Sequence, residues 1–401
     1  MLTNRQLFLL HLGQTSDEPL MIEITKAEGV CMYGPSGEKY IDLISGVSVS
    51  NTGHRHPRVI AAVREQTDSY LHLMVYGEII QSPQVKYAEL LASLLPPSLN
   101  TCFFVNSGSE AVEGAMKLAK RFTGRTRIIY FKDSYHGSTH GALSIQGSDK
   151  YKNAFRPLLP DTLQIRFNDF SDLSAIDEHT AAVIIEPVQA EAGVIFPEEG
   201  FIGEIRKRCS ENGALLVFDE AQTAFGRIGH IFAINRFNVA PDILILAKAL
   251  GGGMPLGAFI SSETIMSSLV NNPRLGHITT FGGHPVCCAA GLASMNVIID
   301  ENLAGQCAAK STAFRRELSH PVIKEVRGEG LLLAIQLTEP RYVRYAIKHA
   351  PDHGIILDYF LFCEDAFRIA PPLIITEEEI MESCRQVRSL LDEAVNNSGK
   401  E

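Results

Sequence analysis

The sequence predicts an α/β protein with a large domain, built on a mixed, mostly parallel β-sheet, and a smaller α+β domain made from both chain ends. Two observations predict this arrangement. In the middle of the chain, short apolar runs alternate with helical patterns, as in a layered sheet whose strands are buried on both faces. Toward both ends, this alternation gives way to other patterns.

The central strands are expected where short, nearly continuous apolar runs occur. The candidates are Thr101–Val105, Arg127–Phe131, Ala182–Ile185, Leu215–Phe218, Ile243–Leu246 and Ala258–Ile260. Such runs fit parallel strands, and the segments between them look helical.

The two ends are expected to fold together. Residues 26–43 carry three glycines between short strand-like pieces, which suggests a β-meander. From about Asn302 the order becomes helix, strand (331–336), helix, strand (366–369) and helix, and Thr376 and Glu379 form a capping box for the last helix. We therefore assign residues 1–45 and 301–401 to the small domain and residues 46–300 to the large one.

Composition excludes several classes of protein. The 401 residues carry 36 Lys+Arg against 46 Asp+Glu, and this net charge of −10 argues against non-specific nucleic-acid binding. No apolar run approaches a membrane span, and the first residues do not read as a signal peptide. The eight cysteines are scattered and no metal-binding motif occurs, so we expect reduced thiols, a cytoplasmic location and no metal site.

Three segments carry chemistry, and the first is a helix start. Ser107 and Glu110 form a second capping box, with Gly108 and Ser109 in the first helical turn. Free N–H groups and the positive end of the helix dipole suit a phosphate there. Taken alone, the segment is better explained as an ordinary helix cap.

The second segment is an acidic pair, Asp219-Glu220, that closes a buried strand at the edge where α/β sheets place ligands. A helix cap, a surface salt bridge and a Mg²⁺ site are the alternatives. The chain has no phosphate-binding loop of the GxxxxGK[ST] type, which weakens the Mg²⁺ interpretation.

The third segment is Lys248, which follows an apolar strand and precedes three glycines. Burial lowers the pKa of an amine and makes it nucleophilic, which suits Schiff-base chemistry, and the glycines leave room for a bulky group. A lysine whose charged end reaches solvent is the alternative. Together the three segments match pyridoxal 5′-phosphate (PLP), which needs an anion site, an acid for its ring nitrogen and a lysine for its aldehyde.

Eight motifs then carry a close resemblance to the class III, fold type I PLP-dependent aminotransferases, over nearly the whole chain. They are Gly53–Pro57, Asn106–Ala111, Tyr135–Gly137, Glu186–Gly193, Asp219–Arg227, Ala247–Gly253, Thr279–Gly283 and Arg368–Leu373. The fold that this resemblance implies agrees with the domain arrangement expected from the patterns above.

The resemblance implies roles for individual residues. Lys248 forms the internal aldimine and then moves the proton, while Asp219 pairs with the pyridinium nitrogen. Gln222 bonds the ring's 3-oxygen and Tyr135 stacks on the ring. Gly108 and Ser109 hold the phosphate. The cofactor site also includes Ser107, His136 and Glu186, and Thr280 reaches the phosphate in the neighbouring subunit of a homodimer.

Substrate binding is implied at Arg368, which grips an α-carboxylate, and at Glu191, which pairs with this arginine when an ω-amine enters. Val47 resembles the small residue of acetylornithine-type enzymes. Ser138 departs from the family, because acetylornithine, ornithine and 4-aminobutyrate aminotransferases usually carry arginine there. Arg55 and Arg166 are candidate replacements for that missing arginine.

We therefore expect transfer of the terminal amino group of an acetylornithine- or ornithine-like donor to 2-oxoglutarate, giving glutamate and a semialdehyde. Alternatives within the family are other ω-amino acids, 4-aminobutyrate, lysine or a diamine. Outside it, a mutase or decarboxylase, or a non-catalytic PLP-binding protein, fits less well. The expected partners are small molecules and a second copy of the chain, with neither nucleic acid nor membrane.

Overall fold

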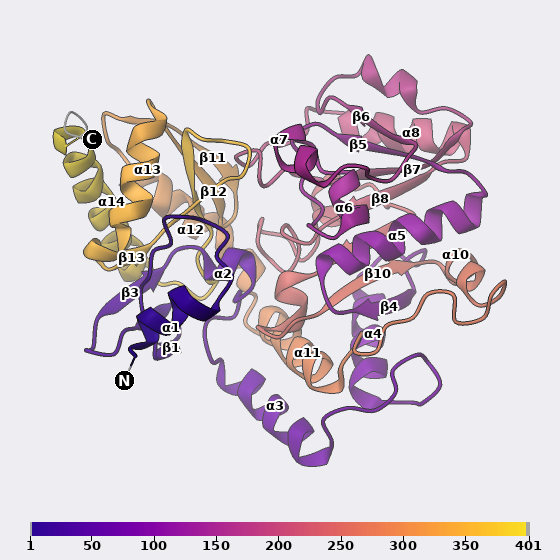
Figure 1. Ribbon diagram of the computed structural model, residues 1–401, viewed down its shortest axis with the longest axis horizontal. Helices are drawn as coiled ribbons and strands as arrows, with labels where there is room; N and C mark the ends of the chain where they lie inside the picture. Colours follow the sequence, from indigo (N-terminus) through magenta and orange to yellow (C-terminus); the bar gives the residue numbers. More distant parts are fainter. Residues whose placement is uncertain (1, 398–401) are drawn as a thin grey trace.

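The computed structural model describes residues 2–397, and its centre is a seven-stranded sheet in the order β4-β10-β9-β8-β7-β5-β6 (Figure 1). The strands are β4 (Thr101–Val105), β5 (Arg127–Phe131), β6 (Thr162–Ile165), β7 (Thr180–Ile185), β8 (Leu215–Asp219), β9 (Ile243–Leu246) and β10 (Gly257–Ser261). All six predicted central strands are therefore present.

Two features of this sheet differ from the prediction. Strand β10, expected to be parallel, runs antiparallel to both β9 and β4. The connection 247–256 is too short for the crossover that a parallel pair needs, which explains the reversal. Strand β6 was not predicted, because it lies at the sheet edge and its residues are mostly exposed or half-buried rather than continuously apolar.

The side chains of the strands pack into two separate hydrophobic cores, one on each face of the sheet. In β8, Leu216 and Phe218 join one core, whereas Leu215 and Val217 join the other. Helices α4 (Ser82–Leu94), α8 (Phe201–Asn212) and α11 (Pro285–Asp300) contribute to the first core, and α5 (Gly108–Thr123) to the second. Burial on both faces, which the apolar runs predicted, is confirmed for β7, β8, β9 and β10, whereas β4 is mostly half-buried.

Both chain ends meet beside this sheet. Strands β1 (Lys26–Glu28), β2 (Cys31–Tyr33) and β3 (Lys39–Asp42) form the predicted meander. Strand β13 (Ile355–Ile356) pairs in parallel with β3, so the N-terminal and C-terminal segments share one sheet. The exact limits at residues 45 and 300 stay a prediction.

A third sheet, in the order β11-β12-β15-β14, belongs to the C-terminal segment. Its strands are β11 (Ile323–Glu329), β12 (Leu332–Leu337), β14 (Asp358–Tyr359) and β15 (Ala366–Ile369), and of these β11 and β14 were not predicted. Helices α12 (Leu303–Glu317), α13 (Pro340–His349) and α14 (Glu377–Asn397) accompany it. The predicted capping box of α14 is confirmed, since Glu379 N donates to Thr376 Oγ1 and Thr376 N to Glu379 Oε2.

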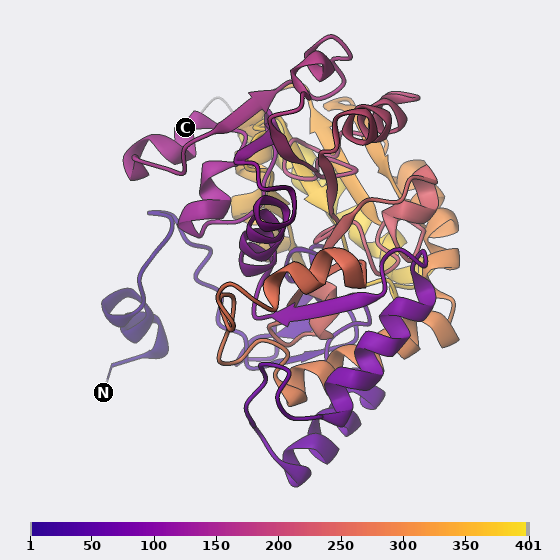
Figure 2. The same ribbon diagram turned by 90° about the vertical axis from the view of Figure 1, so that its right-hand side faces the viewer.

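The remaining helices are short or peripheral. They are α1 (Asn4–His11), α2 (Ser45–Ser48), α3 (Pro57–Ser69), α6 (His140–Ser144), α7 (Asp149–Lys152), α9 (Ala233–Phe237) and α10 (Glu263–Met266). Figure 2 shows α1 apart from the body of the molecule, and none of its residues is buried. All eight cysteines are free thiols, as their scattered spacing predicted.

No single helix within residues 2–397 has the length and apolar composition to cross a membrane, although α11 and α12, bent by 67°, would qualify as a pair.

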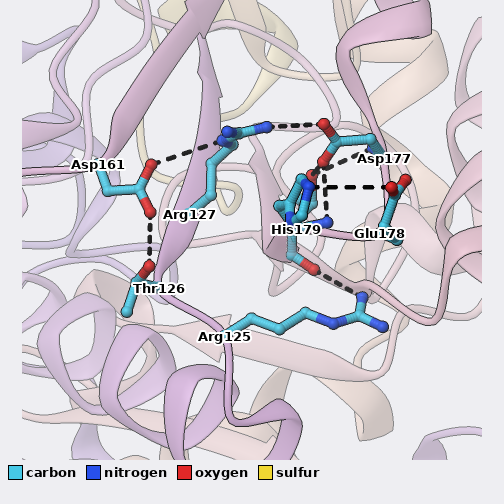
Figure 3. A network of polar contacts seen from close by, with 8 residues as sticks. Arg125, Thr126, Arg127, Asp161, Asp177, Glu178 and His179 are labelled. Atoms are coloured by element: carbon cyan, nitrogen blue, oxygen red, sulfur yellow. Dashed lines mark hydrogen bonds and ion pairs between the residues drawn. The ribbon is translucent and has the colours of Figure 1, made fainter.

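An ionic network fixes the amino-terminal edge of the sheet (Figure 3). Arg127, at the start of β5, lies 2.7 Å from Asp177, which precedes β7, and 3.5 Å from Asp161, which precedes β6. Neighbouring Arg125 donates to the Thr180 carbonyl. This network holds three parallel strands at the edge opposite their carboxyl ends, which are left free to present other side chains.

Candidate active site

A cavity of about 380 Å³ opens at the carboxyl ends of the central strands. Its walls come from the loops after β4, β5, β7, β8 and β9. Of the predicted site residues, those that line it are Ser107, Gly108, Ser109, Tyr135, His136, Glu186, Glu191, Asp219, Gln222 and Lys248. Residues from five separate segments are thus brought to one place, where α/β sheets bind ligands.

The first wall is the N-terminus of α5, whose first-turn N–H groups have no partner within the helix. Ser107 Oγ accepts from Glu110 N at 3.2 Å, so half of the predicted capping box is present. The other half is wrong, because the Glu110 carboxylate accepts from Asn106 N at 2.8 Å instead. A Cβ added to Gly108 would lie 3.1 Å from Ala247 Cβ, so a side chain would be crowded at this position. Glycine leaves the space at the helix N-terminus free for an anion.

Asp219 ends β8 with its side chain almost fully buried. Its Oδ1 accepts from Ala221 N at 3.0 Å, and its Oδ2 lies 2.8 Å from His136 Nδ1. Because a carboxylate can only accept, Nδ1 carries the hydrogen. The opposite ring nitrogen, Nε2 of His136, is buried without a partner among residues 2–397.

The neighbouring acid, Glu220, does not line the cavity and instead binds the start of α9 (Ala233–Phe237). Its carboxylate accepts from the N–H groups of Ala233 and Ile234 at the start of α9. Burial raises its pKa to about 8. The helix-cap interpretation is therefore correct for Glu220, while Asp219 alone lines the cavity.

Lys248 follows β9 in a short 3-10 helix with φ of +53°, a conformation uncommon for a residue with a side chain. Its Nζ donates to Gln222 Oε1 at 2.9 Å. Burial lowers the pKa of this amine, although the carboxylates of Glu191 and Asp219 oppose the shift. The other polar atom of Gln222, the buried donor Nε2, has no partner in the described chain.

Tyr135 and Glu186 also line the cavity. The Glu186 carboxylate accepts from Tyr135 N at 3.1 Å, and its pKa is raised well above its usual value by burial and by nearby Asp219. The Tyr135 hydroxyl lies 3.2 Å from Ser138 Oγ. Gly137, with φ of +125°, lets this loop approach Ser109, since an added Cβ would overlap the serine side chain.

Glu191 separates the cavity from Arg368. Arg368 Nη2 donates to Glu191 Oε1 at 2.6 Å, and the guanidinium is almost completely buried behind this carboxylate. Asp358, which the sequence analysis missed, accepts from Arg368 Nη1 at 3.3 Å. The two residues are partners in the antiparallel pairing of β14 with β15, a register that no local sequence signal reveals.

Four predicted or candidate residues lie outside this group. Val47 sits in α2, and Val49 lines the cavity instead. Thr280 is exposed, whereas its neighbour Thr279 accepts from Asn106 Nδ2 at 2.9 Å. Arg166 is held on the surface by Asp169 and Asp172, and Arg55 is exposed, so neither lines the cavity as a replacement arginine.

The donor set fits PLP. The helix N-terminus can bind the phosphate, the buried carboxylate can pair with the ring nitrogen, and the buried lysine can react with the aldehyde. The unpartnered Gln222 Nε2 offers a hydrogen bond that no described protein group takes. The fold and the site together assign this protein to the class of PLP-dependent enzymes.

The comparisons with known proteins narrow this class. The family model of aminotransferase class-III matches residues 12–391, and the chain belongs to this family of PLP-dependent transaminases. It is 39% identical over 375 residues to the acetylornithine aminotransferase of Methanopyrus kandleri, covering 92% of this chain and 94% of the relative. It is 37% identical to ornithine aminotransferase 2 of Staphylococcus saprophyticus, covering 95% and 97%.

Solved structures agree in fold. The ornithine aminotransferase from Toxoplasma gondii superposes with a TM-score of 0.90 at 29% identity, covering 98% of this chain and 94% of the other. An (S)-enantioselective omega-transaminase from Thermomicrobium roseum gives 0.89 at 27%, covering 97% of each. The predicted fold type I is confirmed.

Proposed function

We propose that the protein transfers the terminal amino group of an acetylornithine- or ornithine-like donor to 2-oxoglutarate. The observation that carries this proposal is the ion pair between Glu191 and Arg368, which lies beside the cavity that holds Lys248. Relatives named for acetylornithine and ornithine support the choice of donor.

The chain's own residues would hold the cofactor as follows. Gly108 and Ser109 would bind the phosphate through the start of α5. Asp219, kept in place by His136, would favour a protonated ring nitrogen, and Gln222 Nε2 would donate to the ring's 3-oxygen. Tyr135 would stack on the ring face.

When bound, PLP supplies an aldehyde that takes up amino groups and a ring that delocalises the electron pair left by a departing proton. Lys248 is the residue that would carry that proton. Its lowered pKa favours the neutral amine, which can accept a proton from the bound substrate and return it to a different atom of the bound molecule.

The ion pair explains how one cavity would serve two substrates. With Glu191 on Arg368, the buried positive charge is masked and a donor can enter with its terminal amine first. When Glu191 moves aside, the planar guanidinium can bind the carboxylate of 2-oxoglutarate or glutamate through two parallel hydrogen bonds.

A second candidate donor class is an amine or diamine without a distal carboxylate. Among the described residues, the charged side chains that line the cavity are Glu186, Glu191, Asp219 and Lys248, so a distal carboxylate would find no arginine there. At the position after Gly137, Ser138 contributes a hydroxyl instead of a positive charge.

A homodimer is also proposed. Leu275, Ile278 and Phe281, which lie near exposed Thr280 in the sequence, are exposed apolar side chains of the kind that a subunit interface would cover. In this homodimer, Thr280 would reach the phosphate of the cofactor in the neighbouring subunit. We also propose that the enzyme is cytoplasmic and that residues 46–300 form the cofactor-binding domain.

An amino-donor panel tests the proposal. Acetylornithine, ornithine, lysine, 4-aminobutyrate, β-alanine and putrescine are each offered with 2-oxoglutarate, and glutamate formation is measured. We expect the highest kcat/KM with acetylornithine or ornithine. A clear preference for putrescine would favour the diamine alternative, and no glutamate from any donor would overturn the assignment of the acceptor.

A further inference from the structure

The loop 360–362 holds Glu191 through two hydrogen bonds. Leu361 N donates to Glu191 Oε2 at 3.2 Å, while Oε1 of the same carboxylate receives Arg368 Nη2. Phe362 N donates to the Glu191 backbone carbonyl at 3.0 Å. To leave Arg368, the carboxylate of Glu191 must therefore also leave the Leu361 N–H.

Helix α7, which belongs to the central domain, fixes this loop. The Tyr151 hydroxyl donates to the Leu361 carbonyl at 3.2 Å, and its ring packs edge-on against Phe362 with centroids 5.6 Å apart. In Figure 1, α7 lies on the side of the central sheet that faces β11 and β12. Tyr151 thus connects the central domain to the segment that carries Arg368.

The peptide group between Leu361 and Phe362 is held at both ends. Its carbonyl receives Tyr151, and its N–H is bound to the backbone of Glu191. With this peptide fixed, the preceding N–H of Leu361 is also held toward Glu191 Oε2. The contacts form one chain from α7 through the loop to the ion pair.

We propose that Tyr151 is a positioning residue that holds Glu191 on Arg368, and so determines how the enzyme divides its affinity between carboxylate substrates and ω-amine donors. This inference rests on the proposed function, because it requires that Glu191 leaves Arg368 when a dicarboxylate binds. Loss of the Tyr151 hydroxyl frees the loop, makes opening easier and leaves the closed state less populated.

The two substrate classes should respond in opposite directions. A dicarboxylate needs the open state, so its binding improves when opening becomes easier. The donor needs the closed state, in which the arginine charge is masked, so its binding weakens. A general loss of packing would instead weaken both, and this contrast separates positioning from mere stability.

The experiment compares the wild-type holoenzyme with Tyr151→Phe, which keeps the ring against Phe362 and removes only the hydroxyl. Binding of glutarate, a dicarboxylate without an amino or keto group, is measured by calorimetry, and KM is measured for 2-oxoglutarate and for the best donor. We expect glutarate Kd and 2-oxoglutarate KM to fall by about two- to fivefold, as for one neutral hydrogen bond. The donor KM should rise by a similar factor, with kcat little changed.

The matched control is Lys150→Ala. Lys150 Nζ lies 3.6 Å from Glu364, so it joins the same helix to the same loop region, but both side chains are more than two-thirds exposed. An exposed pair contributes little, and the Lys150 ammonium lies 5.9 Å from the centroid of the Tyr151 ring, at the outer limit of a cation–π contact, so no change in either constant is expected.

Glu191→Gln separates the two levels of the argument. If this variant leaves glutarate binding unchanged, the ion pair does not control carboxylate access and the proposed function fails. If Glu191→Gln tightens glutarate binding but Tyr151→Phe changes nothing, or shifts both substrates in the same direction, the role of Tyr151 is refuted while the function stands.

Discussion

Replacing Arg227 tests how the two chain ends are joined to the active-site domain. This fully buried residue donates Nη1 to the carbonyls of Leu331 and Pro371, at 2.9 and 2.6 Å. Its Nη2 donates to Ser45 Oγ, at 2.9 Å, and to Asn51 Oδ1. One side chain therefore binds the N-terminal segment, the central domain and the C-terminal segment.

The size of the effect follows from these four bonds. At about 1 kcal/mol net per hydrogen bond, Arg227→Met should lower the free energy of unfolding by about 4 kcal/mol. Burial lowers the pKa of Arg227 to about 10, because the charged guanidinium loses its contact with water. The four hydrogen bonds offset the free energy that this loss of hydration costs.

Urea unfolding of the holoenzyme, followed by circular dichroism at one protein concentration, measures this loss. The control is Arg236→Met, which breaks a half-exposed ion pair with Glu329 and should cost less than about 1 kcal/mol. If Arg227→Met proved no more harmful than this control, the four contacts would not be what joins the chain ends.

Three further predictions concern the cavity and its surroundings. The raised folded-state pKa of Glu220, about 8, means that its contribution to stability is complete below the unfolded value of 4.5 and is lost as pH rises through 8. Glu220→Gln should therefore flatten the fall in the urea midpoint between about pH 5 and about pH 8.5; an unchanged slope contradicts the assignment. Gly137→Ala should weaken PLP retention on dialysis, because the new methyl overlaps Ser109, and full retention would disprove the close approach. Asp219→Asn should lower kcat by roughly 10- to 100-fold through loss of one charged hydrogen bond, and wild-type turnover would remove its role at the ring nitrogen.

Much of the fold could be predicted because buried strands carry a strong local signal. All residues of β7 and β8 are buried, and residues 182–185 and 215–218 of these strands appear in the sequence as continuous apolar runs. Strand β6 gave no such run, since an edge strand buries few of its side chains. The reversed direction of β10 follows from its short connection to β9, residues 247–256. The spacing of the two predicted strands therefore carried this signal, whereas their apolar content alone did not.

The candidate site was predictable to the extent that single segments carry it. Lys248, Asp219 and the start of α5 are each marked by a strand end or a helix cap. The contacts between segments were not marked. The bond from His136 to Asp219, and the second carboxylate at Arg368, require elements distant in sequence to meet in one register.

The central claim is that Lys248 carries PLP, and reduction with borohydride tests it most directly. The purified protein should be yellow, and reduction should fix the cofactor on the peptide that contains Lys248, as found by mass spectrometry; Lys248→Ala should give no such label and no turnover. A colourless protein, or a reduced label on another lysine, would contradict the account.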